Sequence, residues 1–461
     1  MNPSIFKAYD IRGFYPQDLN ENNIVIVVKA IYQFFTEKLS KADLTIVLGR
    51  DMRLSSPSLS EIAKKTLLDL GVTVVDIGLS STPTVYFAVH HFKYDAGIQI
   101  SASHNPKDWN GIKFFYRQRN KLTKVSKNTG MDEIKDLSLR NRFSFSKKPG
   151  KLISKDVLKD EVDYAYKLVN PKIKKFKVVV DTANAMGSLY IEEIFKRTNC
   201  ELVKMNFNLD GTFPAHEANP IKFETLKPLQ QKVIQEKADF GIATDGDGDR
   251  IFFIDEKGQI VPATLISALI AREILQKNKN EKILVDIRYT RNTVKVVKDL
   301  GGTPIINVVG HALITEHLNR VNGAFSGESS GHFFFRETGG AESAIRVIYY
   351  VMKAITKYKK PLSEIIHEFL SSYESSEFNF TLPKGTNNKT VLEKISLDYK
   401  NGEINWMDGL SVDYPNWRFN IRASNTESLI RLNLEADTEA LMKQKLEEVT
   451  AKILSLGARS D

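Results

Sequence analysis

Cysteine is nearly absent from this sequence, because its 461 residues contain only one, Cys200. A single cysteine excludes an internal disulfide framework and any zinc or iron–sulfur site built from several thiolates. Long apolar runs are absent too: no segment approaches the ~18 apolar residues of a membrane span, and the N-terminal MNPSIFKAYDIRG lacks the apolar core of a signal peptide. We therefore expect a cytoplasmic protein without a membrane partner.

Long basic runs are also missing, although 65 Lys and Arg outnumber 56 Asp and Glu and give a formal net charge of +9. The basic residues are interspersed with acids, which argues against a nucleic-acid partner and favours a small anionic substrate. With 42% hydrophobic and 26% charged residues, the composition is globular rather than disordered. At roughly 100–200 residues per domain, the length predicts three or four domains.

Strand-like apolar runs alternate with helix-period segments through most of the chain, which predicts three consecutive α/β domains with parallel or mixed sheets. The alternation begins at LTIVLGR, restarts at KVVVDTAN (177–184) and runs again from a helix over 262–278. The polar stretch RNRFSFSKKPGKLISKDVLKD reads as a linker, and the pattern changes after about 370 to a smaller α+β unit. The predicted domains are residues 1–148, 149–255, 256–368 and 369–461.

The segment DFGIATDGDGDRIFFID carries the most informative pattern. It places Asp245, Asp247 and Asp249 at alternate positions after a strand-like run, and the intervening glycines let the backbone curl so that three carboxylates converge. Hard oxygen ligands suit Mg²⁺. Parts of the pattern also fit a calcium-binding EF-hand, a D-x-D phosphatase or a solvated acidic turn, although an EF-hand needs Gly where this chain has Arg250.

The segment IQISASHNPKDWNGIKFF predicts a strand that ends at Ser103, followed by Asn-Pro and Asn-Gly turns. Since α/β sheets bind ligands at the C-terminal ends of their strands, the exposed Ser103 hydroxyl is either a nucleophile and phosphate carrier or a turn-capping serine. His104 is adjacent, but neighbouring residues of an extended strand point to opposite faces, which argues against a protease-like dyad.

Two further loops carry groups that suit a phosphosugar. RASNTESLIRL (422–432) combines hydroxyls and amides with two guanidinium groups, which fits a phosphate monoester or, alternatively, a strand-joining turn. FSGESSGHFFF (325–335) is a glycine-bracketed loop between apolar strands, which fits sugar hydroxyls or a plain hairpin. Upstream of the core strands FKAYDIRG presents Tyr9 and Arg12, and VVGHALITEH places His311 at a helix start.

Together, YDIRG, SASHNP, DGDGDR, GESSGH and RASNTE resemble the α-D-phosphohexomutase superfamily, in particular its phosphomannomutase/phosphoglucomutase group. The motifs occur in the family's order and span the chain. The resemblance implies four domains around a central cleft, the last built like a TATA-binding-protein-type α+β unit. It also implies reversible transfer of a phosphoryl group between O1 and O6 of a hexose phosphate, through a phosphoserine and a hexose 1,6-bisphosphate that also serves as activator.

The resemblance assigns roles to individual residues. Ser103 matches the phosphoserine, and Mg²⁺ is expected on Ser103 and the three aspartates. Glu328 and Ser330 match residues that hold the sugar 3- and 4-hydroxyls, and the RASNTE loop matches the site for the non-reacting phosphate. The expected catalytic residues are Ser103, His104, Arg12, Lys113 and His332, with His332 or the Lys113/Arg12 pair as general base. The expected substrate-binding residues are Tyr9, Arg250, Arg288, His311, Glu328, Ser330, Arg422, Ser424, Asn425, Thr426 and Arg431.

Three positions depart from the family pattern. Ser428 replaces a common Pro, Ser329 replaces a common Met or Gln, and Arg288 replaces a Lys of some relatives, which keeps the charge but changes the hydrogen-bond geometry.

A phosphoglucosamine mutase is an alternative function, disfavoured because RASNTE lacks the Gly of an R-x-SGTE loop. A Mg²⁺-dependent phosphatase using Asp245 and Asp247 would leave SASHNP and RASNTE unexplained. We expect a monomer or weak dimer that acts on a phosphosugar.

Overall fold

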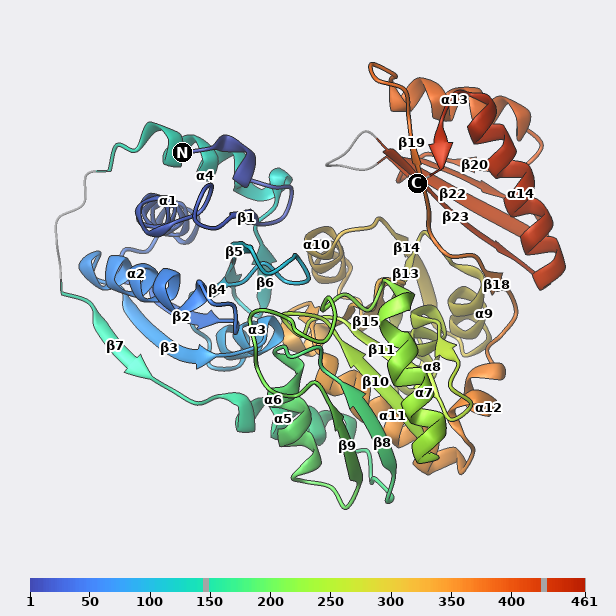
Figure 1. Cartoon of the computed structure of the whole chain (residues 1–461), viewed down its shortest axis with the longest axis horizontal. Coiled ribbons are helices and arrows are strands. Elements are labelled where there is room, and N and C mark those ends of the chain that lie inside the picture. Colours follow the sequence, from blue (N-terminus) through green and yellow to red (C-terminus); the bar gives the residue numbers. More distant parts are fainter. Residues whose placement is uncertain (144–148, 424–428, 461) are drawn as a thin grey trace.

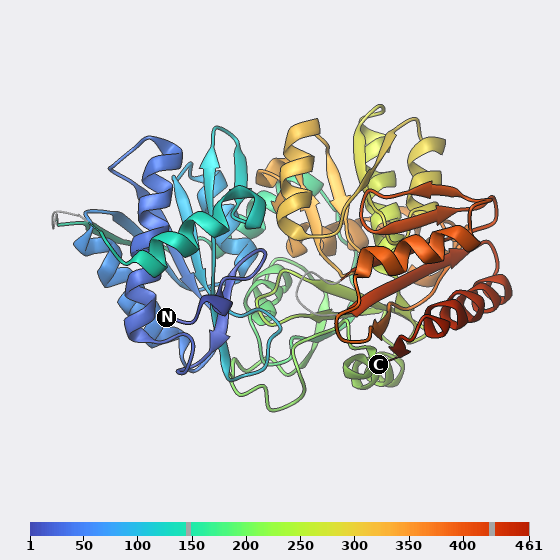
Figure 2. The same cartoon turned by 90° about the horizontal axis from the view of Figure 1, so that it is seen from above.

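Four sheets follow one another along the chain in a computed structural model that describes residues 1–143, 149–423 and 429–460 (Figure 1). The first three sheets are mixed and are covered by helices, and the fourth is antiparallel. The predicted fold class, three α/β domains followed by a smaller α+β domain, is confirmed. We refer to each domain by its sheet. The first domain lies opposite the fourth, with the second and third between them, in both views (Figures 1 and 2).

The first domain has a seven-stranded sheet in which β2 and β4 are central. On β2, Ile46 and Leu48 pack in the cluster that contains α1 and α2, whereas Val47 between them packs against α3, as the period of two in a strand requires. The elements are β1 (Ile11–Phe14), α1 (Glu21–Leu39), β2 (Thr45–Arg50), α2 (Ser56–Asp69), β3 (Thr73–Leu79), α3 (Thr82–His91), β4 (Ala96–Ile100), β5 (Trp109–Gln118), β6 (Lys121–Lys124), α4 (Asp132–Arg140) and β7 (Lys151–Ser154).

Strand β7 belongs to the first sheet although it lies after residue 148, inside the stretch that reads as a linker. Its residues pair in parallel with β3, from Thr73 opposite Lys151 to Asp76 opposite Ser154. The segment is polar and mostly exposed, so its hydrophobic pattern is too weak to predict a strand. The first sheet therefore extends past the predicted boundary.

The second and third domains repeat the mixed architecture with five strands each. One hydrophobic cluster runs through both, from β8 and β10 to α8 and α11. The second domain contains α5 (Leu158–Val169), β8 (Lys177–Asp181), α6 (Gly187–Phe195), β9 (Glu201–Met205), α7 (Lys227–Glu236), β10 (Phe240–Thr244), β11 (Ile251–Asp255) and β12 (Ile260–Val261). The third contains α8 (Ala263–Lys277), β13 (Lys282–Asp286), α9 (Arg291–Asp299), β14 (Thr303–Asn307), α10 (His311–Val321), β15 (Phe325–Gly327), β16 (Phe333–Phe335), β17 (Ala341–Glu342), α11 (Ala344–Tyr358) and α12 (Leu362–His367).

The fourth domain has a core made of its own residues, gathered between its sheet and two helices. Its longest pairing joins β22 and β23 and sets Arg422 opposite Arg431. The elements are β18 (Tyr373–Glu374), β19 (Phe378–Thr381), α13 (Asn388–Asp398), β20 (Glu403–Asn405), β21 (Leu410–Asp413), β22 (Trp417–Ala423), β23 (Leu429–Ala436), α14 (Glu439–Ser455) and β24 (Arg459–Ser460). None of the helices in the described part of the chain is long and apolar enough to cross a membrane.

The chemically informative segments occupy equivalent places in the four domains. Each connects two neighbouring antiparallel strands: SASHNP joins β4 to β5, DGDGDR joins β10 to β11, GESSGH joins β15 to β16, and RASNTE joins β22 to β23. In the first three domains the strand that enters the segment also pairs in parallel with a neighbour. The first three domains therefore repeat one architecture even though no sequence repeat is visible.

Polar contacts join the first domain to the third. Lys124, at the end of β6, forms a buried ion pair with Glu342 in β17 and lies over the rings of Tyr86 and Phe334. Asn319 of α10 donates hydrogen bonds to the carbonyl oxygens of residues 122 and 339. A buried ammonium without its carboxylate is costly, so these contacts fix the two domains against each other.

The fourth domain is held to the third by hydrogen bonds. Arg418 in β22 donates to the carbonyl oxygens of Ile287 and Arg288, at 2.8 and 3.2 Å. The carboxylate of Glu435 in β23 accepts hydrogen bonds from the backbone N–H groups of Thr290 and Arg291 at the start of α9. Arg288 is therefore tied to the sheet that carries the RASNTE segment.

Candidate active site

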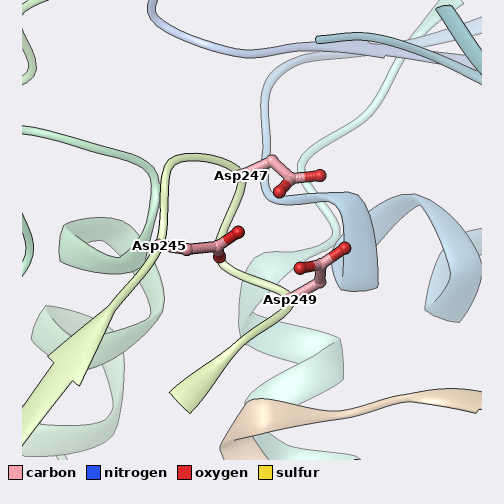
Figure 3. A group of neighbouring side chains, drawn as sticks. All are labelled: Asp245, Asp247 and Asp249. Carbon is pink, nitrogen blue, oxygen red and sulfur yellow. The ribbon is translucent and has the colours of Figure 1, made fainter. Parts of the chain in front are cut away.

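Three aspartates converge on the turn that connects β10 to β11 (Figure 3). Ligand oxygens of Asp245, Asp247 and Asp249 lie within 4.8 Å of one another, and all three side chains are buried. Burial and the charges of the other two carboxylates raise the pKa of Asp245 well above its ordinary value. The convergence predicted from the sequence is confirmed, and like charges buried so closely call for a cation.

The aspartate turn has an oxygen available for a cation. Oδ1 of Asp247 is buried and has no hydrogen-bond partner within the described ranges. Its other oxygen accepts hydrogen bonds from Lys113 Nζ at 2.6 Å and from the hydroxyl of Thr82. A divalent cation with a preference for oxygen, such as Mg²⁺, satisfies an orphaned carboxylate oxygen of this kind, so the residues present fit such an ion.

Ser103 faces this turn from the first domain. Its Oγ lies 3.2 Å from Asp245 Oδ2, across the junction of two domains. Gly246 packs against the serine so closely that a Cβ atom there would lie 2.2 Å from the Ser103 carbonyl oxygen. The glycine between the first two aspartates therefore permits the approach of nucleophile and carboxylates.

Two expectations about the serine loop are wrong. Ser103 is not exposed, since only 2% of it is accessible beneath the aspartate turn. His104 does not point away from it, because His104 Nδ1 lies 3.2 Å from Ser103 Oγ. Both expectations assumed a strand that ends at Ser103, whereas β4 ends at Ile100 and Ser103 has a left-handed φ of +53°. Burial and the charges of Arg250 and Arg12 hold the pKa of His104 well below its ordinary value, so its imidazole is neutral.

Lys113 and Arg12 bring positive charge to the serine loop. Lys113 Nζ donates to Asp247 Oδ2 at 2.6 Å and to Asp249 Oδ2 at 2.8 Å. Burial lowers the pKa of Lys113, but the two carboxylates outweigh burial and raise it above its ordinary value. Arg12, in β1, is anchored by Asp10 and donates to the carbonyl oxygen of residue 102 and to the side chain of Asn105.

His332 links the aspartate turn to the GESSGH segment. Its Nε2 lies 3.3 Å from Asp249 Oδ1, and its Nδ1 lies 3.0 Å from Glu328 Oε2 and from Ser330 Oγ. Burial opposes the charged imidazolium, but Asp249 and Glu328 outweigh burial and raise the pKa of His332 to about 9. Arg250 Nε also lies 3.2 Å from Nε2. At neutral pH His332 is therefore charged in this arrangement.

Tyr9 and His311 lie beside this cluster. Their rings meet edge to face with centroids 5.3 Å apart, and the centroid of His311 lies 6.5 Å from that of His332. Burial and the charges of Lys124 and Lys113 hold the pKa of His311 well below its ordinary value. His311 is thus a neutral imidazole at the first turn of α10, where the sequence predicted a helix start.

Three arginines of the third and fourth domains gather around one carboxylate. Glu377 lies 2.9 Å from Arg422 Nη2, 3.7 Å from Arg431 Nη1 and 3.9 Å from Arg288 Nη1. Arg288 is also paired with Asp286 at 2.7 Å and Glu328 at 3.4 Å. The Nε atoms of Arg422 and Arg431 are buried without a hydrogen-bond partner in the described part of the chain. Three arginines and three carboxylates thus meet here, and two of the arginines keep unused donors.

A continuous chain of polar contacts connects the two groups. It passes from Asp249 to His332, Glu328, Arg288 and Glu377. Five other predicted site residues contact a member of this chain: Lys113, Arg250, Ser330, Arg422 and Arg431. Ser103 joins the aspartate turn through Asp245, with His104 beside it, whereas Arg12 contacts the serine loop and Tyr9 contacts His311. The other predicted phosphate-loop residues, Ser424, Asn425 and Thr426, lie outside the described residues, as does Ser428.

Four domain families match this chain. They are described as "Phosphoglucomutase/phosphomannomutase, alpha/beta/alpha domain I" over residues 3–140, "domain II" over 156–258, "domain III" over 264–373 and "C-terminal domain" over 387–452. The chain belongs to the phosphoglucomutase/phosphomannomutase family. The resemblance found in the five sequence motifs is confirmed.

Relatives within this phosphoglucomutase/phosphomannomutase family match the chain from end to end. A phosphomannomutase of Vibrio cholerae is 36% identical over 463 residues, and one of Methanocaldococcus jannaschii is 35% identical over 461 residues. Both alignments cover 98% of this chain and 98% of the relative. The crystal structure of a phosphoglucomutase/phosphomannomutase family protein from Burkholderia thailandensis has a TM-score of 0.87 at 28% identity and covers 100% of this chain and 99% of that one.

Sequence reasoning missed two side chains at the site of this phosphohexomutase-family chain. Thr82, the first residue of α3, hydrogen-bonds Asp247 with both its hydroxyl and its backbone N–H. Glu377, just before β19, gathers the three arginines. The Ser-Thr-Pro-Thr start of α3 signals a helix N-terminus but not its partner, and no local pattern marks Glu377.

Proposed function

We propose that this protein is a phosphomannomutase/phosphoglucomutase that reversibly moves a phosphoryl group between O1 and O6 of a hexose phosphate. The observation that carries the proposal is the contact between Ser103 Oγ and Asp245 Oδ2, which brings a nucleophilic hydroxyl to a set of carboxylates suited to a divalent cation. Phosphorylated Ser103 donates its phosphoryl group to the free hydroxyl of a hexose 1- or 6-phosphate, which gives a hexose 1,6-bisphosphate. After the bisphosphate turns over, the phosphoryl group at its other end returns to Ser103. Covalent catalysis of this kind keeps the phosphoryl group away from water.

Mg²⁺ is the expected cofactor, with Asp245, Asp247, Asp249 and Ser103 as the residues that hold it. When bound, it neutralises negative charge on the transferring phosphoryl group, for which positioning and electrostatics do most of the catalytic work. Lys113 holds two of the aspartates in place, and Thr82 fixes the middle one from α3.

Proton transfer at Ser103 falls to His104. Its neutral Nδ1 lies 3.2 Å from Ser103 Oγ and accepts the hydroxyl proton when the serine takes up phosphate. His332 is charged and lies between Asp249 and Glu328, so in this arrangement it donates rather than accepts a proton. Arg12 orients the serine loop, and Tyr9 and His311 complete the wall beside His332.

The sugar binds between the two groups of charges. Glu328 and Ser330 hold the 3- and 4-hydroxyls, and Arg288, Arg422 and Arg431 take the phosphate that does not react, together with Ser424, Asn425 and Thr426. Arg250 adds positive charge beside His332. Because mannose and glucose differ only at C2, a site that holds O3 and O4 accepts both sugars. The two phosphates exchange ends when the bisphosphate turns over.

A coupled assay tests the proposal. Purified protein is supplied with Mg²⁺, a hexose 1,6-bisphosphate activator and, in separate reactions, mannose 1-phosphate, glucose 1-phosphate or glucosamine 1-phosphate. We expect turnover of the first two within about 10³-fold of each other, and an intact mass that shows a phosphate adduct of about 80 Da on part of the sample. Release of inorganic phosphate without isomerisation would indicate a phosphatase, and preference for the amino sugar would indicate a phosphoglucosamine mutase. We expect the active enzyme to be a cytoplasmic monomer or weak dimer.

A further inference from the structure

A fully buried arginine, Arg53, lies beneath the serine loop. It follows β2, its side chain is 0% exposed, and it takes no part in the contacts described so far. Its guanidinium donates to four backbone carbonyl oxygens of one loop: Nη2 to those of Ser103 and Asn105 at 2.8 and 2.6 Å, and Nη1 to those of Pro106 and Trp109 at 2.7 and 2.9 Å. One side chain thus holds the whole connection between β4 and β5.

Arg53 is itself held from two sides. Its Nε lies 3.2 Å from Asp51 Oδ2, and its backbone N–H donates to Asp51 Oδ1 at 3.0 Å. The ring of Phe213, from the second domain, covers the guanidinium with its centroid 5.2 Å away. The arginine therefore couples the serine loop to β2 and to the domain that carries the aspartates.

The serine loop needs such support. Ser103 has a φ of +53°, in the left-handed region that is unfavourable for residues other than glycine and persists where surrounding contacts impose it. Arg53 binds the carbonyl oxygens of Ser103 itself and of the residue two positions later. A lysine has one nitrogen and cannot reach four carbonyls arranged around a planar fork.

We propose that Arg53 is the positioning residue of the nucleophile, which holds residues 103–109 in the conformation that presents Ser103 Oγ to Asp245. The inference rests on the proposed function of Ser103 and adds a residue that touches neither substrate nor metal. Because a displacement of about 1 Å in reacting groups costs on the order of 10²-fold in rate, loss of this support lowers turnover and leaves the affinity for the phosphosugar nearly unchanged.

The test compares Arg53→Lys with Arg346→Lys in the full-length enzyme. Arg346 is a matched control in α11: it is 3% exposed, pairs with Glu337 at 2.9 Å and lies over the ring of Phe335. For Arg53→Lys we expect kcat to fall about 10–100-fold with KM within about threefold, and for Arg346→Lys we expect kcat within about twofold of wild type. Amide hydrogen exchange of residues 103–109 should accelerate in Arg53→Lys alone.

A milder variant keeps the test decisive if Arg53→Lys does not fold. Asp51→Asn retains the four hydrogen bonds of Arg53 but removes its buried counter-ion, and we expect a smaller fall in kcat of about threefold to tenfold at constant KM. Wild-type kcat in folded Arg53→Lys, or equal losses in Arg53→Lys and Arg346→Lys, would overturn the inference. Failure of both site variants to fold would assign Arg53 to stability alone. If wild type neither isomerises phosphosugars nor carries phosphoserine, the proposed function fails instead.

Discussion

The two ends of the candidate site gather side chains of opposite charge. At the aspartate end, three buried carboxylates lie within 4.8 Å of one another and Lys113 pairs with two of them. At the arginine end, three guanidinium groups surround Glu377, and two of them have unused donors. Among the described residues, a carboxylate oxygen of Asp247 and the Nε atoms of Arg422 and Arg431 have no hydrogen-bond partner, so we expect a metal cation at the first end and a phosphate at the second.

The two ends also differ in how they are supported. The aspartate end lies where the first domain meets the second, beside the hydrophobic cluster that runs through the second and third domains. The arginine end depends on the fourth domain, whose core consists of its own residues and which meets the third domain through hydrogen bonds of Arg418 and Glu435. The proposed function places the chemistry at the aspartate end and ligand capture at the arginine end, and this division can be tested.

Removal of the metal should have the largest effect on turnover, because the metal is expected at the aspartate end, where the reaction takes place. Chelation is expected to abolish turnover, and added Mg²⁺ to restore it. Asp247→Asn should weaken the affinity for Mg²⁺ by about 10–100-fold, since one ligand charge is lost, while Asp299→Asn on the surface of α9 serves as the control. Titration of activity with Mg²⁺ measures both. Full activity in the presence of chelator would contradict this assignment.

Loss of the proposed nucleophile should have the second-largest effect on turnover. Ser103→Ala is expected to lower kcat by on the order of 10²–10⁴-fold, because only positioning and electrostatics then act on the phosphoryl group. Its mass spectrum should lack the adduct of about 80 Da that wild type carries on a peptide containing Ser103. A phosphate at another residue with undiminished turnover would move the reaction to a different nucleophile.

At the arginine end, Arg422→Lys should reduce capture rather than chemistry. A lysine keeps the charge but loses the forked geometry, so we expect KM to rise about tenfold with kcat within about threefold. Steady-state kinetics with mannose 1-phosphate and glucose 1-phosphate should show equal changes for both sugars. A fall confined to kcat would show that the two ends do not divide the work in this way.

Glu377→Gln should change affinity in the opposite direction. The carboxylate of Glu377 occupies the arginines that a phosphate must reach, and the amide keeps the shape without the competing charge. We expect KM for phosphosugars, and the inhibition constant of inorganic phosphate, to fall about threefold. Glu393→Gln, on the exposed surface of α13, is the matched control. A rise in KM would mean that Glu377 chiefly orients the arginines.

The smallest expected effect is on how the stability of the protein depends on pH, and it comes from a buried glutamate, Glu161. Burial raises the pKa of Glu161 in α5 to about 7, despite a hydrogen bond from Thr84 of α3. The folded state therefore binds a proton that the unfolded state releases near pH 4.5, and stability is lost as pH rises through about 7. Glu161→Gln removes this loss, so its melting temperature relative to wild type should rise between pH 5 and pH 8. Glu393→Gln should show no such trend.

The sequence predicts the fold and much of the site because short segments of the chain determine both. Apolar runs of strand length predict β4, β10 and β23, and the alternate aspartates after β10 predict their own convergence. Four of the five informative motifs lie in a connection between adjacent strands, where a few residues determine the turn, and the fifth, YDIRG, runs into β1. Family resemblance then supplies roles that the patterns alone leave open.

What the sequence does not predict depends on contacts between distant segments. The left-handed backbone of Ser103 is imposed by Arg53 from β2's end and by Gly246 from the second domain, so neither its burial nor the direction of His104 follows from the motif. The contacts of Thr82 with Asp247 and of Glu377 with the arginines likewise join segments that are far apart in the sequence. The sequence does not predict strand β7 because its mostly exposed residues lack an apolar face.

The buried pair of Lys124 and Glu342 has a consequence for how the chain is made. The two residues are 218 positions apart, so at roughly 5–20 residues per second a ribosome needs about 10–40 s to deliver the carboxylate after the lysine. During that interval β6 ends in an ammonium group that has no partner for burial, and the ring of Phe334 that covers it has not been made either. The junction between the first and third domains at Lys124 therefore forms only after residue 342 has been made, and we expect nascent chains that stop before residue 342 to keep this end of β6 exposed to water.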